Sequence, residues 1–516
     1  MEGYAKVDGR GVFEAARECL EAEIVWLDGA EAGVLEHAEL ERVMQERGRE
    51  LQRLLLQAHL ELRSVREERL VEVVGVGGAA RRWAESGRCT PLASVFGQVT
   101  VERIAYRRRG EADLHPLDAA LNLPAEKYSH GLREALVRAA ISGSYKHAQE
   151  QVKRHSGVTV PMRQLGALIV DAAQDFEGFY NRLEHTDTDT DTDTDTDTDT
   201  DTDTEEMLLV VSCDGKGVVM RPGSLRGGTA KAAAGAKNKL ATRLSRGEKT
   251  NRKRMAEVAC VYDAAPAVRE AADIVRFPNQ PERDPVPGPV AVNKWLTASV
   301  AKDAKQVIAE AFDQAIYRDP DRRRTWVALV DGNNHQIDRI TAEARTRDIE
   351  IAIVVDFVHV TEYVWKAAWC FFSEGDPKAE EWVGGMLRAI LDGHASRVAG
   401  AVRRKATWAK LTGTKRQCAD ETANYLLAKA PYLDYPTALA AGWPIATGVI
   451  EGAVRHVVKD RMDITGARWG LDGAEAVLRL RALHANDDFD AYWAYHLHRE
   501  HQRVHAAKYL NHEIPT

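Results

Sequence analysis

The apolar positions of this chain change their period about half-way along it. Up to residue 183, leucine, valine and alanine recur mainly at the spacing of amphipathic helices. After residue 206 the chain instead contains four short apolar runs: MLLVVSCDG, RMAEVACVYD, TWVALVDG and IEIAIVVDFVHV. Such runs predict buried strands, and helical segments separate the last of them, so the second half is expected to form a mixed sheet flanked by helices. The stretch from Thr361 to Leu439 returns to a wholly helical pattern.

Residues 1–130 predict a helical region with a short β-hairpin. From Val12 to Leu70, apolar positions at helical spacing alternate with charges, which fits either a dimerisation helix or an amphipathic helix packed on its own domain. The hairpin is expected in the alternating segment SVFGQVTVERIAYRRRG (94–110). Residues 115–129 have the composition of a loop, and helix is expected to resume at Leu132.

The pattern of residues 131–185 predicts a DNA-binding segment that resembles a helix-turn-helix. A helix from about Tyr145 to His155 is followed by the break SGVTV, and a second helix opens at Pro161, because the first helical turn tolerates proline. Two helices joined by a few residues that include Gly are typical of this motif. The basic side chains that would then face DNA phosphates are Lys153, Arg154 and Arg163. A solvated helix surface explains these charges equally well.

A strict Thr-Asp alternation begins at residue 186 and predicts a disordered linker over residues 186–206. Its nine aspartates account for the acidity of the chain, since without them the formal net charge of −8 becomes +1. The tract has no apolar face to bury and repels itself along its length. An extended connector is therefore favoured over a strand or a mimic of the nucleic-acid backbone.

Three acidic residues carry the candidate chemistry. Two of the apolar runs stop at Asp-Gly, at Asp214 and Asp331, and Gly lets the backbone turn at once, so both carboxylates are expected at one edge of the sheet. Two such carboxylates repel each other unless they share a cation, which indicates a hard, oxygen-liganded metal such as Mg²⁺ (or Mn²⁺). Glu451, in the helical segment TGVIEGAVRHVVKDRM (447–462), would complete the site.

Composition argues against a membrane protein and against a zinc site. No apolar run approaches the about 18 residues of a transmembrane helix, and the N-terminus lacks an apolar signal segment, so a cytoplasmic protein with no membrane partner is expected. The six cysteines are scattered, with no CxxC pair and no His at zinc spacing.

Several long segments resemble a known family. SCDGKGVVMRPGSLR, GEKTNRKRMAEVACVYD, VALVDGNNHQ and the C-terminal region that begins at TGVIEGAVRHVVKDRM are similar to transposases of ISKra-type bacterial insertion sequences. The Thr-Asp tract before the first strand also fits that family. The resemblance implies an α/β, ribonuclease H-like catalytic core with an all-α insertion. In that fold Asp214 lies on the first strand, Asp331 at the end of the fourth, and Glu451 on a later helix.

The resemblance also implies a division of the chain and an activity. Residues 207–360 would form the first part of the core, 361–440 the helical insertion, and 441–516 the end of the core with the Glu helix and C-terminal helices. The three acids would act as catalytic residues and hold two metal ions, for cleavage of the element's ends and strand transfer into target DNA. The implied partners are the terminal inverted repeats, the target DNA and a second subunit, because two ends have to be held together. The protein would associate with the nucleoid when bound to DNA.

Other residues receive supporting roles. DFVH places Asp356 and His359 in a (Cys/Asp)-x-x-His signature of related transposases, which implies positioning of DNA or of the second Asp, whereas such a pair more often caps a helix or pairs within the core. The run from Arg221 to Arg254 holds eleven Lys or Arg and one acid, which favours contact with the DNA backbone. The basic residues expected at DNA in this half are Lys216, Arg252, Lys253, Arg254, Arg455, Lys459 and Arg461. The Trp residues of the insertion fit either core packing or stacking on a displaced base.

Three other functions share some of these features. A ribonuclease H-like nuclease or resolvase would use the same acids without strand transfer. A DNA-binding protein with a decayed catalytic core would keep only the binding surfaces. A sugar-kinase-like phosphotransferase also uses Asp-Gly strand ends, but no Gly-rich phosphate loop accompanies them in this sequence.

Overall fold

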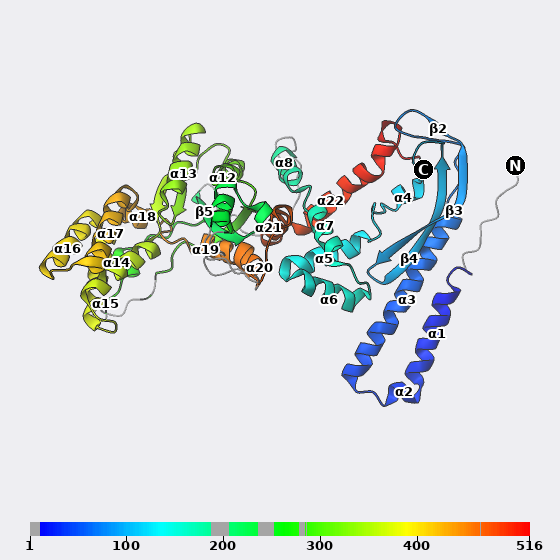
Figure 1. The fold of residues 1–516 in the computed structure, drawn as a ribbon, viewed down its shortest axis with the longest axis horizontal. Helices are drawn as coiled ribbons and strands as arrows, with labels where there is room; N and C mark the ends of the chain where they lie inside the picture. The colour runs from blue at the N-terminus through cyan, green and yellow to red at the C-terminus, as the bar shows by residue number, and fades with distance from the viewer. Residues whose placement is uncertain are drawn as a thin grey trace. The chain divides into compact units, whose positions relative to one another are not determined.

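The chain divides into two compact units. The computed structural model describes residues 11–186, 206–235, 252–277, 284, 286–464 and 466–515. Residues 1–182 and 488–516 belong to the first unit, and residues 183–487 to the second (Figure 1). Residues 187–205 of the predicted Thr-Asp linker and residues 236–251 in the middle of the basic run from Arg221 to Arg254 lie outside the described residues. Each described helix is either too short or too polar to cross a membrane.

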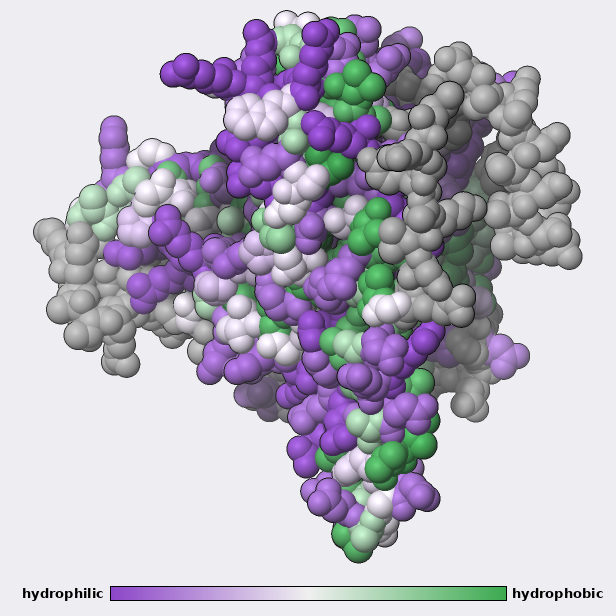
Figure 2. Space-filling view, turned by 90° about the vertical axis from the view of Figure 1, so that its right-hand side faces the viewer, coloured by the Kyte–Doolittle hydropathy of each residue, from purple (hydrophilic) through white to green (hydrophobic). Residues whose placement is uncertain are grey.

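A pair of helices forms an arm at the start of the first unit. The N-terminal helices are α1 (Glu14–Asp28), α2 (Ala30–Gly33) and α3 (His37–Val65). The predicted helical stretch is therefore broken near Gly29, and α1 and α3 lie side by side (Figure 1). Apolar side chains remain on the surface of this arm, among them Leu20, Ile24, Leu27, Met44 and Leu55. Figure 2 shows these apolar patches among polar side chains.

A long β-hairpin packs against α3. Its strands β3 (Trp83–Ser94) and β4 (Gly97–Arg107) pair antiparallel, and a smaller pair, β1 (Val73–Val74) and β2 (Ala80–Arg81), lies beside them in sequence. The hairpin expected within residues 94–110 is thus misplaced, since only its second strand lies there. The first strand was missed because WAESGRCTP is largely polar and exposed and shows no apolar alternation.

The remaining helices of the first unit include the predicted two-helix motif. They are α4 (Pro116–Ala120), α5 (His130–Ser142), α6 (Tyr145–Ser156), α7 (Met162–Ala172), α8 (Phe176–Thr186) and α22 (Phe489–Val504). The predicted helices before and after SGVTV are confirmed as α6 and α7, and Gly157 ends α6 with a φ of 72°. The short α4 lies in a segment expected to be a loop. Because α22 belongs to this unit, the expected C-terminal segment 441–516 is divided between the two units.

A buried ionic network holds α22 in the first unit. Asp175, just before α8, accepts hydrogen bonds from His496 Nδ1 at 2.7 Å and from both terminal nitrogens of Arg503, at 2.6 and 2.7 Å. Glu500 accepts from Arg503 at 2.7 Å and from the buried Arg133 of α5 at 3.2 Å. Charges buried in this way stabilise a fold only while each retains its partners.

A mixed sheet forms the centre of the second unit, as the sequence predicts, but it has five strands rather than the four that the apolar runs indicate, because β7 was not expected. Its strands are β5 (Leu208–Val219), β6 (Lys253–Ala264), β7 (Ala291–Ser299), β8 (Trp326–Val330) and β9 (Ala352–Val355). The spatial order is β7-β6-β5-β8-β9. β5, β6 and β7 are antiparallel neighbours, while β5, β8 and β9 run parallel. All residues of β8 are buried, which explains its uninterrupted apolar sequence.

Helices pack on the sheet and follow it. Those outside the insertion are α9 (Gly227–Gly235), α11 (Ala271–Ile274), α12 (Ala304–Arg318), α13 (Asn334–Thr346), α19 (Gly448–Ala453), α20 (Asp460–Met462) and α21 (Leu471–Ala485). The buried Glu475 of α21 accepts hydrogen bonds from Ser299 Oγ and from the backbone N–H groups of Val300 and Ala301, so it fastens α21 to the end of β7.

The predicted helical stretch after the last strand is confirmed. Its helices are α14 (Phe357–Phe371), α15 (Pro377–Leu391), α16 (Ala395–Trp408), α17 (Gly413–Lys429) and α18 (Tyr435–Ala440). α17 packs against both α14 and α16. The helices therefore form a bundle between β9 and α19, that is, between the second and third acids in the chain.

The Asp175 network is expected to make the first unit less stable in acid. Burial alone raises the pKa of Asp175, but the hydrogen bonds from His496 and Arg503 outweigh it and lower the pKa to about 2, from an ordinary 3.8. The resulting stabilisation, on the order of 2 kcal/mol, is present at neutral pH and is lost as the pH falls from about 4 to about 2. Asp175→Asn should remove it at neutral pH, which faster amide hydrogen exchange in α22 would report.

Asp171→Asn is the matched control, in the last turns of α7. Burial raises the pKa of Asp171, so neutralising this acid removes no favourable charge. Exchange in α22 should stay as slow as in the unsubstituted protein. Equal exchange rates in both variants would show that the Asp175 network contributes nothing.

Candidate active site

Asp214 lies within β5 rather than at its end. β5 continues to Val219 and pairs with β6 over its whole length, where Asp214 is opposite Val258. Its parallel pairing with β8 stops earlier, at Ser212. The expectation of a strand end at Asp-Gly is wrong, because an antiparallel partner keeps the backbone extended through Gly215. Asp214 nevertheless lies just beyond the point where β5 and β8 part.

Asp331 follows directly after β8, as predicted. Its Oδ1 accepts a hydrogen bond from Asn333 N at 2.7 Å, which shapes the turn into α13. Gly332 has a φ of 91°, a conformation that favours glycine. A Cβ at Gly332 would also lie 2.8 Å from the hydroxyl oxygen of Tyr425, so α17 of the insertion approaches this turn closely.

Asp356 is completely buried and caps the first turn of α14. Its Oδ1 accepts from Val358 N at 3.0 Å and from Thr447 N at 3.3 Å. Its Oδ2 accepts from His359 Nδ1 and from Thr447 Oγ1, both at 2.9 Å. The capping role that the sequence left open is therefore present, and the same carboxylate also orients the His359 ring.

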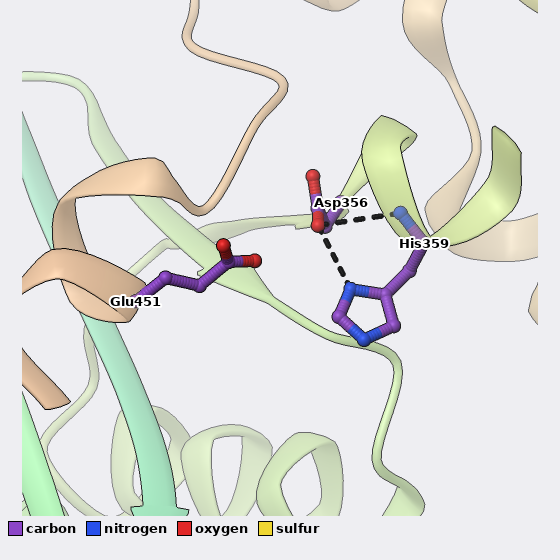
Figure 3. A group of neighbouring side chains, drawn as sticks. All are labelled: Asp356, His359 and Glu451. Carbon is purple, nitrogen blue, oxygen red and sulfur yellow. Dashed lines mark hydrogen bonds and ion pairs between the residues drawn. The ribbon is translucent and has the colours of Figure 1, made fainter. Parts of the chain in front are cut away.

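Glu451 lies on α19 and is directed toward the Asp356–His359 pair (Figure 3). Its Oε1 is 3.0 Å from Thr447 Oγ1. A hydroxyl has one proton, so Thr447 donates to Asp356 or to Glu451, but not to both at once. Whenever the proton points to Asp356, Glu451 Oε1 is left for another partner.

The helix after Glu451 is not a regular α-helix. Val454–Lys459 form a π-helical turn between α19 and α20. Arg455 and Lys459 therefore do not follow Glu451 at regular α-helical spacing, because a π turn shifts the angular positions of its residues. π turns are frequent at functional sites.

The charges of Asp331 and Glu451 both act on Asp214. Burial raises the pKa of Asp214 first, and the charges of Asp331 and Glu451 raise it further, while His359 lowers it. Burial alone would lower the pKa of His359, but its hydrogen bond to Asp356 and the charges of Asp356 and Asp331 outweigh this and raise it. The site thus concentrates negative charge around one imidazole.

Asp214, Asp331 and Glu451 differ from Asp356 in the hydrogen bonds that their carboxylate oxygens accept. Asp214 Oδ1 accepts from Gly215 N at 2.6 Å, and the Oδ1 of Asp331 and Oε1 of Glu451 have the contacts described above. Within the described part of the chain, the second oxygen of each accepts no hydrogen bond. Both oxygens of Asp356 are already used. Hard oxygen atoms of this kind fit Mg²⁺ or Mn²⁺.

The tightest group of metal-ligating side chains in the described residues is a different one. Ligand atoms of Asp356, His359 and Glu451 all lie within 4.8 Å of one another (Figure 3). Since Asp356 has no oxygen left, this group offers a cation at most Glu451 and the second ring nitrogen of His359. The predicted set of Asp214, Asp331 and Glu451 keeps more free oxygens but does not meet that spacing.

Three further residues near the acids carried no signal in the sequence. Glu257 of β6 is half-buried beside Asp214, and burial raises its pKa. Lys429, at the end of α17, is buried and hydrogen-bonded to Asn334, and its pKa is lowered by burial. Thr447 precedes α19. All three act through contacts between segments far apart in the chain, which one-dimensional patterns do not show.

The predicted DNA-binding residues lie in different environments. Arg461 is only 2% exposed, and its guanidinium lies over the Trp469 ring at 4.7 Å, so it packs inside the unit. Arg254 donates to the backbone carbonyls of Ser224, Val300 and Ala301, which ties β6 to its neighbours. The residues with exposed side chains are Lys153, Arg154, Arg163, Lys253, Arg455 and Lys459, and the half-buried ones are Lys216 and Arg252.

Comparison with known proteins adds little to this geometry. No protein-family model and no curated protein matches the chain. Among solved structures, the chain is similar to the Drosophila P element transposase strand transfer complex, with a TM-score of 0.23 and 10% identity, covering 71% of this chain and 79% of that chain. A TM-score this low carries no argument about fold or function.

The crowded carboxylates are expected to destabilise the metal-free protein. Because burial and like charges raise the pKa of Asp214, its ionised form disfavours the folded state once the pH exceeds the ordinary pKa. Asp214→Asn should therefore increase the free energy of unfolding at neutral pH, by on the order of 1 kcal/mol in urea denaturation. Added Mg²⁺ should stabilise the unsubstituted protein more than the variant. A less stable variant without metal would contradict this account of the site.

Proposed function

We propose that the protein is a DNA transposase that cleaves the ends of its own element and joins them to target DNA. The observation that supports this proposal is that the charges of Asp331 and Glu451 act on Asp214 and raise its pKa, while each of the three acids keeps a carboxylate oxygen that accepts no hydrogen bond from the described residues. The order of the acids supports it: Asp214 is on the first strand of the sheet, Asp331 follows the fourth, and Glu451 is on a later helix. This is the order expected of a ribonuclease H-like core with an insertion.

Each acid then has a distinct place in the reaction. Two Mg²⁺ or Mn²⁺ ions held by Asp214, Asp331 and Glu451 would stabilise charge on the attacking and leaving oxygens of a phosphodiester. By the family resemblance, Asp214 is assigned to both ions. Asp331 is fixed by its hydrogen bond to the turn before α13, and Glu451 Oε1 lies 3.0 Å from the hydroxyl of Thr447.

Asp356 and His359 are assigned positioning roles. The Asp356 carboxylate accepts the Nδ1 proton of His359, so the other ring nitrogen is presented to the acids. The same carboxylate holds Thr447, four residues before Glu451. Loss of either contact would leave Glu451 less well oriented.

DNA and a second copy of the chain are the proposed partners. Arg455 and Lys459 extend from the turn that follows Glu451 and are exposed, as phosphate contacts require. Lys153, Arg154 and Arg163 on α6 and α7 would contact the element's ends. At least a dimer is expected on DNA, since strand transfer joins two ends.

The proposal predicts metal-dependent nicking and joining. Purified protein with Mg²⁺ and a duplex that carries the DNA flanking its gene should give site-specific nicks and joined products. Asp214→Asn, Asp331→Asn and Glu451→Gln should each reduce both by a factor on the order of 10² to 10³ or more. Asp321→Asn, an exposed acid paired with Arg323 outside the site, is the matched control.

The outcomes separate the related activities. Full cleavage by all three variants would refute the assignment of the acids. Nicks that depend on the acids but never yield joined products would favour a nuclease or resolvase instead.

His359→Ala should mainly raise the Mg²⁺ concentration needed for half-maximal cleavage. A neighbour that orients a metal ligand typically contributes about 10- to 100-fold in metal affinity. Asp356→Asn should act in the same direction, because it weakens the link to both His359 and Thr447. His456→Ala, an exposed His paired with Asp460 on the following turn, serves as the control. An unchanged Mg²⁺ dependence in His359→Ala would remove His359 from the site.

A further inference from the structure

The turn between α16 and α17 exposes a tryptophan among basic side chains. Trp408 is the last residue of α16 and is 79% exposed. Residues 395–418 contain seven Lys or Arg and no Asp or Glu. The seven are Arg397, Arg403, Arg404, Lys405, Lys410, Lys415 and Arg416. The sequence left two roles open for the tryptophans of the insertion, core packing or base stacking. Because Trp408 is exposed, it does not pack in the core.

Three of the seven cations are used inside the bundle. Arg416 pairs with Asp420 at 2.8 Å, and Arg403 donates to Asn424. Lys405 lies over an aromatic cluster, with its Nζ 4.8 to 5.9 Å from the ring centroids. The rings of this cluster are Phe371, Phe372 and Trp382.

The other four cations are exposed and available to a ligand. Arg397, Arg404, Lys410 and Lys415 have no acidic partner in the described parts of the chain. Arg397 and Arg404 are seven residues apart, and Trp408 follows four residues later, so the three share one face of α16. We name the set of Arg397, Arg404, Trp408, Lys410 and Lys415 the basic tip.

The basic tip is an ordered turn. Ala409 N donates to Lys405 O at 2.9 Å, and Leu411 N to Ala406 O at 3.0 Å, which closes the end of α16. Arg416 Nη1 also donates to Thr407 Oγ1 at 3.2 Å and so links the two helices. The indole is therefore presented on a fixed backbone, with little conformational entropy to lose when it binds.

The helix α17 connects the basic tip to the acids. Its last residue, Lys429, is hydrogen-bonded to Asn334 beside the Asp331 turn, and its first residue, Gly413, lies between Lys410 and Lys415 of the tip in the chain. Its 17 residues span about 25 Å at 1.5 Å per residue. That length corresponds to about seven steps along a DNA strand at 3.4 Å each.

We propose that the basic tip binds DNA about seven nucleotides from the scissile phosphate. Arg397, Arg404, Lys410 and Lys415 contact the backbone, and Trp408 stacks on an unpaired base. Charge complementarity selects a polyanion, and an exposed indole between cations suits a nucleic-acid base. The choice of DNA rests on the proposed function.

Salt-dependent binding tests this proposal without any cleavage. The probes are a long duplex of arbitrary sequence and the same duplex with a short single-stranded gap, both without divalent metal. Arg404→Ala should lower the slope of log affinity against log salt by about 1 on either probe. Trp408→Ala should weaken binding to the gapped duplex on the order of tenfold with little change of slope, and Trp408→Phe should restore most of it.

Lys378→Ala provides the matched control, because this lysine is exposed on α15 in the same bundle. It should change neither affinity nor slope. Thermal denaturation should show all variants folded, since the substituted side chains lie on the surface.

The outcomes distinguish the basic tip from the active site. Unchanged affinity and slope in Arg404→Ala and Trp408→Ala, with normal cleavage, would overturn the basic tip and leave the proposed function intact. The expected binding changes in a protein that cleaves no DNA would support the tip and refute the proposed function. Weakened binding to polyglutamate with no change toward DNA would indicate a protein partner and overturn the proposal.

Discussion

The buried carboxylate of Asp356 is the constraint on which the candidate site depends. An unpaired charge inside a protein is strongly destabilising, so complete burial of this group requires the hydrogen bonds that surround it. Its donors come from the first turn of α14 and from Thr447. The hydrogen bonds to this one carboxylate therefore hold three segments together: the end of β9, the first turn of α14 and Thr447, which directly precedes α19.

The acids around this anchor place like charges near one another, which opposes the stability of the fold. Asp214 and Asp331 come from neighbouring parallel strands, and Glu451 is brought to them by α19. This negative charge acts on two basic groups: it raises the pKa of the His359 imidazole, and the charge of Asp331 opposes the lowering of the Lys429 pKa by burial. Repulsion among these carboxylates lowers the stability of the metal-free protein. A metal ion bound between them would relieve the repulsion and raise the stability of the folded state. Such local strain is common where function depends on charge.

The sequence predicted the elements of the core better than their ends. Strands buried on both faces are apolar throughout, so β5, β6, β8 and β9 stand out against polar surroundings. The end of β5 was misjudged because local turn propensity at Gly215 is overridden by pairing with β6. The π turn after Glu451 and the burial of Arg461 were missed for a similar reason, since packing rather than local propensity determines both.

The candidate site was predictable only in part. Asp331 was identified by its position after a buried run, and Asp214 by the same Asp-Gly pattern. The contacts of Thr447 with Asp356 and of Lys429 with Asn334 join residues 91 and 95 positions apart. No periodicity within one segment reports such pairs. The exposure of Trp408 was likewise undetermined, because buried and exposed aromatic residues look alike in a helical pattern.

Localised backbone cleavage by bound iron would test the central claim most directly. Fe²⁺ bound in place of Mg²⁺ reduces added hydrogen peroxide to a hydroxyl radical and hydroxide at the site it occupies, ascorbate returns the resulting Fe³⁺ to Fe²⁺, and the radicals cut the nearby polypeptide. If Asp214, Asp331 and Glu451 hold the cation, cuts should map to all three segments, and excess Mg²⁺ or Asp214→Asn should suppress them. Cuts confined to the segment of Asp356 and His359, or none that Mg²⁺ suppresses, would contradict the account.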